Sequence, residues 1–115
     1  MSKSFEELVE KAKVIMKEHN TEIEKKWGTG YNSEHEFFGI VKEELEEVGE
    51  NYEELKEVIE KRIWQKIRKD EGIEKSDCQL IQMLALQVIA EAIQVGAVAM
   101  RMENGIKNKG SEQQT

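Results

Sequence analysis

The 115-residue sequence contains no proline. No pyrrolidine ring therefore interrupts a helix at any position. Asp, Glu, Lys and Arg make up 36% of the residues, and long charged side chains such as Glu and Lys lose little entropy in a helix. These features predict an all-α fold of long helices. A chain of this length supports one modest core, so we expect a single domain over residues 1–105 and a polar, disordered tail over residues 106–115.

Apolar residues recur at steps of three and four along most of the chain, which is typical of amphipathic helices. The pattern predicts four helices, over residues 4–26, 34–48, 51–69 and 76–103. Because the connections between them are short, we expect a four-helix up-and-down bundle.

Capping residues set the expected helix boundaries. Three capping boxes are expected at helix starts, and two glycine-containing stops at helix ends. The boxes are Ser33 with Glu36, Asn51 with Glu54 and Ser76 with Gln79; the stops are Gly49 and Asn104-Gly105.

Charge and cysteine content restrict the partners of the protein. The formal net charge of −7 disfavours nucleic acid, because an acidic surface repels phosphate backbones. The single cysteine, Cys78, and the polar start of the chain favour a cytoplasmic protein. The apolar stretch 80–102 is long enough to raise the question of a membrane span. It contains Glu91 and Arg101, however, and such charges are costly inside a bilayer, so we expect no membrane association.

The last predicted helix is apolar on nearly all sides, unlike the other three. Such a helix has to be covered on several faces, either at the centre of a bundle or at an oligomer interface. Gly96 and the neighbouring alanines would let another helix approach closely. Because the other helices are few, we expect a helical dimer interface, in a homodimer or a homotetramer.

A polar stripe interrupts this apolar helix. Its members follow helical spacing and share one face: Gln87, Glu91, Gln94 and Arg101. A buried, unpaired carboxylate is costly, so Glu91 requires a cation, a metal ion or a proton. A salt bridge to another helix, or partial exposure, would satisfy Glu91 equally well. The sequence alone leaves the structural and the functional interpretation open.

A second acidic group lies in the segment Glu43-Glu44-Leu45-Glu46-Glu47. Glu44 and Glu47 are three residues apart and can direct their carboxylates toward one point. Together with a third carboxylate from another helix, they would suit magnesium, which prefers oxygen ligands. A glutamate-rich helix also produces this spacing by chance, and such runs usually form a solvated face.

These two segments, 33–47 and 91–101, resemble the MazG-like all-α nucleoside triphosphate pyrophosphohydrolases, and more narrowly their small phage- and prophage-type branch. The family carries an EExxE motif and a later ExxD motif, whose carboxylates hold Mg²⁺. The resemblance implies a MazG-like fold and hydrolysis of a ribo- or deoxynucleoside triphosphate to the monophosphate and pyrophosphate. The first motif matches at Glu43, Glu44 and Glu47. In the second motif Glu91 matches, but Gln94 replaces the aspartate.

The resemblance also implies roles for individual residues. Mg²⁺, with Mn²⁺ as a possible substitute, would be held by Glu44, Glu47, Glu91 and Gln94. Gln94 supplies an oxygen without charge, so metal affinity should fall and hydrolysis should weaken. Glu43 or Glu36 would accept a proton from the attacking water. The expected substrate-binding residues are Arg101, His35 and Gln87, although Arg101 also suits an ordinary ion pair.

An alternative from another functional class is a non-catalytic helical binding or assembly protein with a degenerate MazG-like site. In that case Glu91 and Gln94 would be buried polar groups that fix helix register. The enzyme hypothesis predicts that Glu44, Glu47 and Glu91 meet at metal-bridging distance. The alternative predicts that Glu91 pairs with a lysine or arginine and that Glu44 and Glu47 face water.

Overall fold

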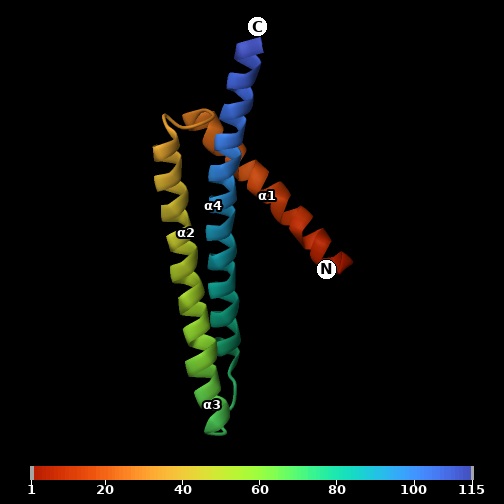
Figure 1. The fold of residues 1–115 in the computed structure, drawn as a ribbon. Coiled ribbons are helices and arrows are strands. Elements are labelled where there is room, and N and C mark those ends of the chain that lie inside the picture. The colour runs from red at the N-terminus through yellow and green to blue at the C-terminus, as the bar shows by residue number, and fades with distance from the viewer. Residues whose placement is uncertain (1, 115) are drawn as a thin grey trace. The chain divides into compact units, whose positions relative to one another are not determined.

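The computed structural model describes the backbone of residues 2–114 and the side chains of residues 2–107, and within this part of the chain there is no strand. The all-α prediction is therefore confirmed. Three long helices and two short segments follow one another along the chain (Figure 1): α1 (Lys3–Trp27), α2 (Glu34–Glu57), the π-helical segment η1 (Val58–Ile63), α3 (Trp64–Arg68) and α4 (Lys75–Gln114).

The starts of α1 and α2 follow from their capping residues. The Ser2 hydroxyl accepts a hydrogen bond from the backbone N–H of Phe5 and caps α1. At α2 the Ser33 hydroxyl accepts from the N–H of Glu36, as the capping box predicted. The Glu36 carboxylate in turn accepts from the backbone N–H of Asn32. Both caps satisfy amide groups that have no partner inside the helix.

The predicted break between the second and third helices is wrong. Helix α2 runs through Gly49 to Glu57 and continues through η1 and α3, so Asn51 caps nothing. Gly49 does not take the positive φ that a helix-ending glycine usually adopts. A helical glycine costs only about 1 kcal/mol, and the good helix formers around it offset that cost. The described part of the chain therefore has three long helices where the sequence predicted four helices.

The segment η1 changes which face of this continuous helical run is covered. Up to the start of η1 at Val58, the half-buried residues follow steps of three and four, at Asn51, Leu55 and Val58. The next half-buried residue is Ile63, five positions later, and Lys66 follows three positions after it. A π-helical turn inserts one extra residue, which accounts for the step of five. It places Lys66 on the covered side of α3.

The expected boundaries of the last helix also need correction. Helix α4 begins at Lys75, so Ser76 lies inside its first turn, and Asp77 instead accepts from the N–H of Glu74. The helix does not stop at Asn104-Gly105 but continues to Gln114. Asn104 donates to the Glu24 carboxylate of α1, so its side chain supports the packing of α4. The expected disorder of residues 106–115 stays a prediction.

The chain contacts divide the protein into two units. One unit comprises the residues up to Glu44 and those from Ile93 onward. In it, the Met16 side chain of α1 occupies the space beside Gly96 of α4. The other unit comprises Leu45–Ala92, in which the second half of α2 runs antiparallel to the first half of α4 (Figure 1).

An ion-pair network closes the unit formed by Leu45–Ala92. The fully buried carboxylate of Asp77 accepts from Lys66 Nζ at 2.6 Å and from Arg62 Nε at 3.1 Å. These bonds connect η1 and α3 to the first turn of α4. They hold the pKa of Asp77 below its usual value, chiefly through the hydrogen bond from Lys66.

Few apolar side chains are fully buried within the described chain: Leu84 and Ala97. Among the described residues, one helix is long and apolar enough to cross a membrane, within residues 75–107 at a mean hydropathy of 1.7. A core helix of a soluble protein passes the same test, so this finding alone does not assign the helix to a membrane.

Candidate metal centre

Glu47 and Glu91 face each other between α2 and α4 in the unit Leu45–Ala92. Glu47 lies on the covered side of α2, next to half-buried Val48, and Glu91 lies two turns after the buried Leu84 on α4. Helical spacing directs both side chains toward the partner helix. The two carboxylates are close enough to share a hydrogen bond.

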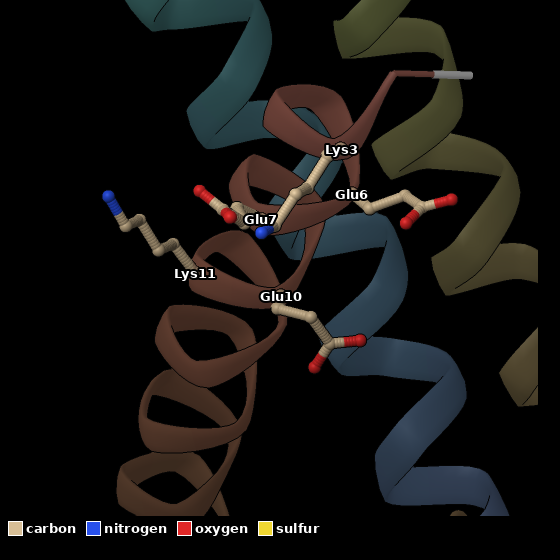
Figure 2. Close-up of a pocket in the computed structure, with 5 residues that line it drawn as sticks. All are labelled: Lys3, Glu6, Glu7, Glu10 and Lys11. Atoms are coloured by element: carbon tan, nitrogen blue, oxygen red, sulfur yellow. The ribbon is translucent and has the colours of Figure 1, made fainter.

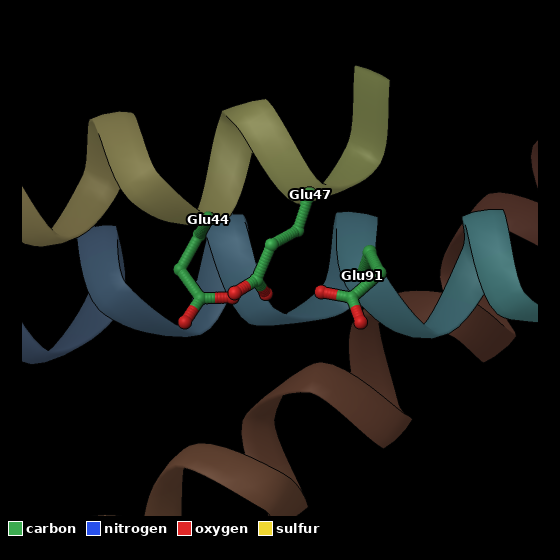
Figure 3. A group of neighbouring side chains, drawn as sticks. All are labelled: Glu44, Glu47 and Glu91. Atoms are coloured by element: carbon green, nitrogen blue, oxygen red, sulfur yellow. The ribbon is translucent and has the colours of Figure 1, made fainter. Parts of the chain in front are cut away.

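Glu44 joins this pair from the preceding turn of α2. Because α2 is continuous, Glu44 and Glu47 share one face at a spacing of three residues. One carboxylate oxygen from each of Glu44, Glu47 and Glu91 lies within 4.8 Å of the other two. Figure 3 shows the two carboxylates of α2 pointing toward that of Glu91 from α4. The structure therefore brings together the three glutamates that the sequence predicted to converge.

The electrostatics of the cluster show a local excess of negative charge. The pKa of Glu91 is raised, first by its hydrogen bond with Glu47, then by burial and by the charges of Glu47 and Glu50. A proton held by Glu91 is therefore shared with Glu47. The second oxygen of Glu91, Oε2, is buried and has no hydrogen-bond partner. Among the described side chains, no lysine or arginine forms an ion pair with either Glu47 or Glu91.

These observations fit a hard divalent cation. Three carboxylates offer oxygen ligands from two helices, which is the donor set that Mg²⁺ and Mn²⁺ accept. An ion at the point of convergence would replace the shared proton and satisfy the buried Oε2 of Glu91. The charge of the ion would also remove the repulsion that raises the pKa of Glu91.

Gln94, one turn after Glu91, is connected to α1. Its side-chain oxygen lies 2.9 Å from Nε2 of His19, in a partly buried hydrogen bond. With the ring proton on Nε2, His19 donates this hydrogen bond and the amide oxygen of Gln94 accepts it. The NH2 group of Gln94 remains as a donor. This contact was not anticipated, although the sequence does place His19 on the apolar face of α1.

Arg101 supports the loop that joins α1 to α2. Its guanidinium donates to the backbone oxygens of Gly28 and Trp27, and its carbon lies 4.4 Å from the centre of the Tyr31 ring. The backbone oxygen of Arg101 accepts from the N–H of Gly30. These contacts give Arg101 a structural role. The ion pair that the sequence also suited is not among them, and the expected phosphate contact stays a prediction.

The remaining predicted residues are exposed. Glu43 is exposed on α2 next to Glu44, and Glu36 is exposed and engaged in the α2 cap. His35 and Gln87 are exposed, in the first turn of α2 and on α4 respectively. The structure therefore groups the predicted metal-binding glutamates, whereas the predicted proton acceptors and two of the predicted substrate-binding residues, His35 and Gln87, lie on the surface.

A second polar cluster joins α1 to α4 and was missed by the sequence analysis. Glu24 accepts from the side chains of Asn20 and Asn104. Asn20 is only 3% exposed, and its side-chain oxygen is buried without a partner. A signal existed, because Asn20 and Glu24 are four residues apart on the helix. An asparagine at the margin of an apolar face does not, however, identify its partner.

Two surface hollows are lined by described residues other than those of the acidic cluster. Five charged side chains at the start of α1 line one of about 480 Å³ (Figure 2): Lys3, Glu6, Glu7, Glu10 and Lys11. A smaller hollow of about 240 Å³ is lined by Gln65, Arg68 and Lys69. Neither contains a residue of the predicted site.

Comparisons with protein-family models, with curated proteins and with solved structures found no match for this chain.

Proposed function

We propose that this protein is a Mg²⁺-dependent nucleoside triphosphate pyrophosphohydrolase with a MazG-like fold. The supporting observation is the convergence of Glu44, Glu47 and Glu91 within 4.8 Å, together with the raised pKa of Glu91. Among the described side chains no lysine or arginine forms an ion pair with Glu47 or Glu91, and a metal–triphosphate complex would bring positive charge to these carboxylates. The reaction class comes from the resemblance of the two acidic segments to that family.

In this proposal each residue has a defined task. Glu44, Glu47 and Glu91 would hold the ion, with Glu91 in its ionised form. When bound, Mg²⁺ neutralises phosphate oxygens and lowers the pKa of a coordinated water. Glu43, exposed beside Glu44, accepts a proton from the attacking water. The water oxygen forms a bond to the α-phosphorus, the bond between that phosphorus and the bridging oxygen breaks, and pyrophosphate leaves.

Gln94 modifies this site in one respect. Because its oxygen is engaged by His19, Gln94 contributes a donor NH2 group and no negative charge. A donor near the ion suits a phosphate oxygen, which a carboxylate would repel. The expected consequence is a site with three charged ligands, lower affinity for the free ion, and a need for millimolar Mg²⁺.

The decisive experiment measures pyrophosphate release from a panel of ribo- and deoxynucleoside triphosphates, with Mg²⁺ and with EDTA. Release should require the metal and fall by at least about 100-fold in Glu47→Gln and Glu91→Gln, as is typical when catalytic charge stabilisation is lost. Glu46→Gln is the matched control, because Glu46 is exposed on the same helix and outside the cluster. Absence of release from every triphosphate, or equal release in all variants, would refute the hydrolase proposal.

The alternative function is a helical binding or assembly protein that retains the acidic cluster without catalysis. Two observations favour it: the amide oxygen of Gln94 is engaged by His19, and Arg101 is engaged by the loop at residues 27–31. In that case Mg²⁺ binds and stabilises the protein, but no pyrophosphate appears. Isothermal titration with MgCl2 alone, alongside the release assay, separates the two functions.

A further inference from the structure

The end of the helical run formed by α2, η1 and α3 is basic, although the chain as a whole is acidic. Residues 61–69 contain five of the seventeen lysines and arginines and no aspartate or glutamate, whereas the chain has a net charge of −7. This segment lies where the chain turns from α3 into α4, within the unit Leu45–Ala92 (Figure 1). Because salt screens charges beyond about 8 Å, such a segment attracts anions even on an acidic protein.

Three of these five cations have a structural role. Arg62 and Lys66 bind the buried carboxylate of Asp77. Lys61 forms an ion pair with Glu57 at 3.2 Å. The network around Asp77 and this surface pair therefore account for three of the positive charges and leave two.

The remaining two cations, Arg68 and Lys69, line a hollow. Among the described side chains, no carboxylate forms an ion pair with either of them. Both are exposed, and together with Gln65 they enclose about 240 Å³, which we call the basic hollow. Arg68 and Lys69 follow Gln65 by three and four residues, so the three side chains leave the same face of the helical run.

The basic hollow is lined by hydrogen-bond donors. The guanidinium of Arg68 and the ammonium of Lys69 only donate, and the amide of Gln65 adds a further donor. A phosphate group has more acceptor oxygens than a carboxylate and binds arginine in a bidentate manner, so it matches this set better. A helix C-terminus also favours cations, but that effect does not account for the amide donor or for the hollow.

Trp64 adds a planar apolar surface next to this hollow. Its side chain is 54% exposed, and it precedes Arg68 by four residues, which places both on one face. A nucleobase stacks on an exposed tryptophan while phosphates bind neighbouring cations. An inorganic anion would leave Trp64 unused, and a long nucleic-acid strand would meet the acidic remainder of the chain. A free nucleotide uses both features.

We propose that the basic hollow and Trp64 form a nucleotide-binding site that requires no metal ion. The phosphates bind Arg68 and Lys69, Gln65 donates from its amide, and the base stacks on Trp64. Because stacking tolerates every base, this site selects for phosphate groups and not for one nucleobase. The hollow begins eighteen residues after Glu47, roughly 27 Å along the helical run at about 1.5 Å per residue. It is therefore separate from the acidic cluster and does not depend on the hydrolase proposal.

Binding of adenosine triphosphate to the full chain in EDTA tests this proposal, because without metal the acidic cluster repels a triphosphate. Titration calorimetry should show binding that weakens as NaCl rises. Arg68→Gln and Lys69→Gln should each weaken it by at least about tenfold, the effect of losing one hydrogen bond from a charged donor. Lys56→Gln is the matched control, since it removes one exposed positive charge from α2 in the same unit. Circular dichroism shows whether each variant is folded.

The fluorescence of Trp64 provides a second readout. Trp27→Phe leaves Trp64 as the only tryptophan of the chain. Adenosine triphosphate should change its emission, because the base stacks on the ring. Inorganic pyrophosphate has no base, so it should bind at least about fivefold more weakly and leave the emission unchanged.

Three results would overturn the proposal. The first is no binding of adenosine triphosphate in EDTA at millimolar concentration. The second is binding that Arg68→Gln and Lys69→Gln leave unchanged. The third is tighter binding of a ten-nucleotide oligothymidylate that depends on Arg68, which would replace the nucleotide with a nucleic-acid strand. Glu47→Gln should retain the binding in EDTA, so a failure of the hydrolase proposal is distinguishable from a failure of this one.

Discussion

Glu91→Gln tests whether repulsion between the carboxylates of the acidic cluster destabilises the protein when no cation is bound. The carboxylates of Glu47 and Glu91 lie within 4.8 Å of each other. At that separation, repulsion between two full charges is about 0.9 kcal/mol in water and about 3.5 kcal/mol at an effective dielectric of about 20. The substitution removes this repulsion and leaves an amide that can donate to Glu47. We therefore expect the metal-free variant to be more stable than the wild type at pH 7.5, by about 1–3 kcal/mol.

The dependence on pH has a definite sign. Because the pKa of Glu91 is raised in the folded protein, the folded state holds this proton more tightly than the unfolded chain. The stability that Glu91 contributes is fully present below its unfolded pKa of about 4.3 and is lost as pH rises through the raised value. Metal-free wild type should therefore lose stability across this interval. Glu91→Gln should show a flatter profile there.

Thermal unfolding followed by circular dichroism, between pH 4.5 and 8, measures both effects. With MgCl2 at ten times the dissociation constant, the wild type should gain about 1.4 kcal/mol, which the variant should lack. Glu46→Gln removes an exposed charge from the same helix and should retain the Mg²⁺ response. A Glu91→Gln variant that is less stable than the wild type in EDTA at pH 7.5 would refute the argument.

Three further predictions concern other parts of the chain. Gln94→Asp adds a fourth carboxylate, so titration calorimetry should show at least about tenfold tighter Mg²⁺ binding; unchanged affinity would place residue 94 outside the site. Gly105→Ala should lower the free energy of unfolding, measured in urea, by about 1–3 kcal/mol, because a Cβ at this position would meet the backbone of Gly30. An unchanged free energy of unfolding would contradict this contact. The pKa of Asp77 is lowered, chiefly by Lys66, so its stabilisation is present above pH about 3.9 and is lost at lower pH. Asp77→Asn should therefore lower the urea midpoint of unfolding at pH 7. Between pH 7 and pH 3 the midpoint of the variant should fall less than that of the wild type. An unchanged midpoint at pH 7 would contradict this.

Local signals in the sequence predicted the parts of the fold that depend on neighbouring residues. The Ser33–Glu36 capping box and the apolar spacing of α1 involve residues within one or two turns, and both predictions hold. Gly49 was misinterpreted because a glycine stops a helix only where the chain adopts a positive φ, and tertiary contacts decide that. The same limit applies at Gly105, where a close contact with Gly30, not a helix end, requires glycine.

The acidic cluster was predictable in part. The cost of burying Glu91 and the spacing of Glu44 and Glu47 indicated that these residues need a shared partner. The sequence could not predict that Arg101 would bind backbone oxygens of the loop at residues 27–31, because that depends on where α1 ends relative to α4. It also could not assign His19 to Gln94, because their contact spans 75 positions.

In the proposed site Gln94 stands where the family that the sequence resembles carries an aspartate, and this difference has a physical consequence. The pKa of Glu91 is raised by the hydrogen bond with Glu47, by burial and by the charges of Glu47 and Glu50, so a negative charge on Glu91 is disfavoured in the absence of a cation. A fourth carboxylate would increase that repulsion, whereas a neutral amide avoids it and also binds α1 through His19. Compared with a carboxylate at this position, Gln94 should lower the affinity for the free ion and raise the stability of the metal-free protein. In such a site most of the binding energy for the ion has to come from the phosphates, so Mg²⁺ should bind far more tightly together with a triphosphate than alone.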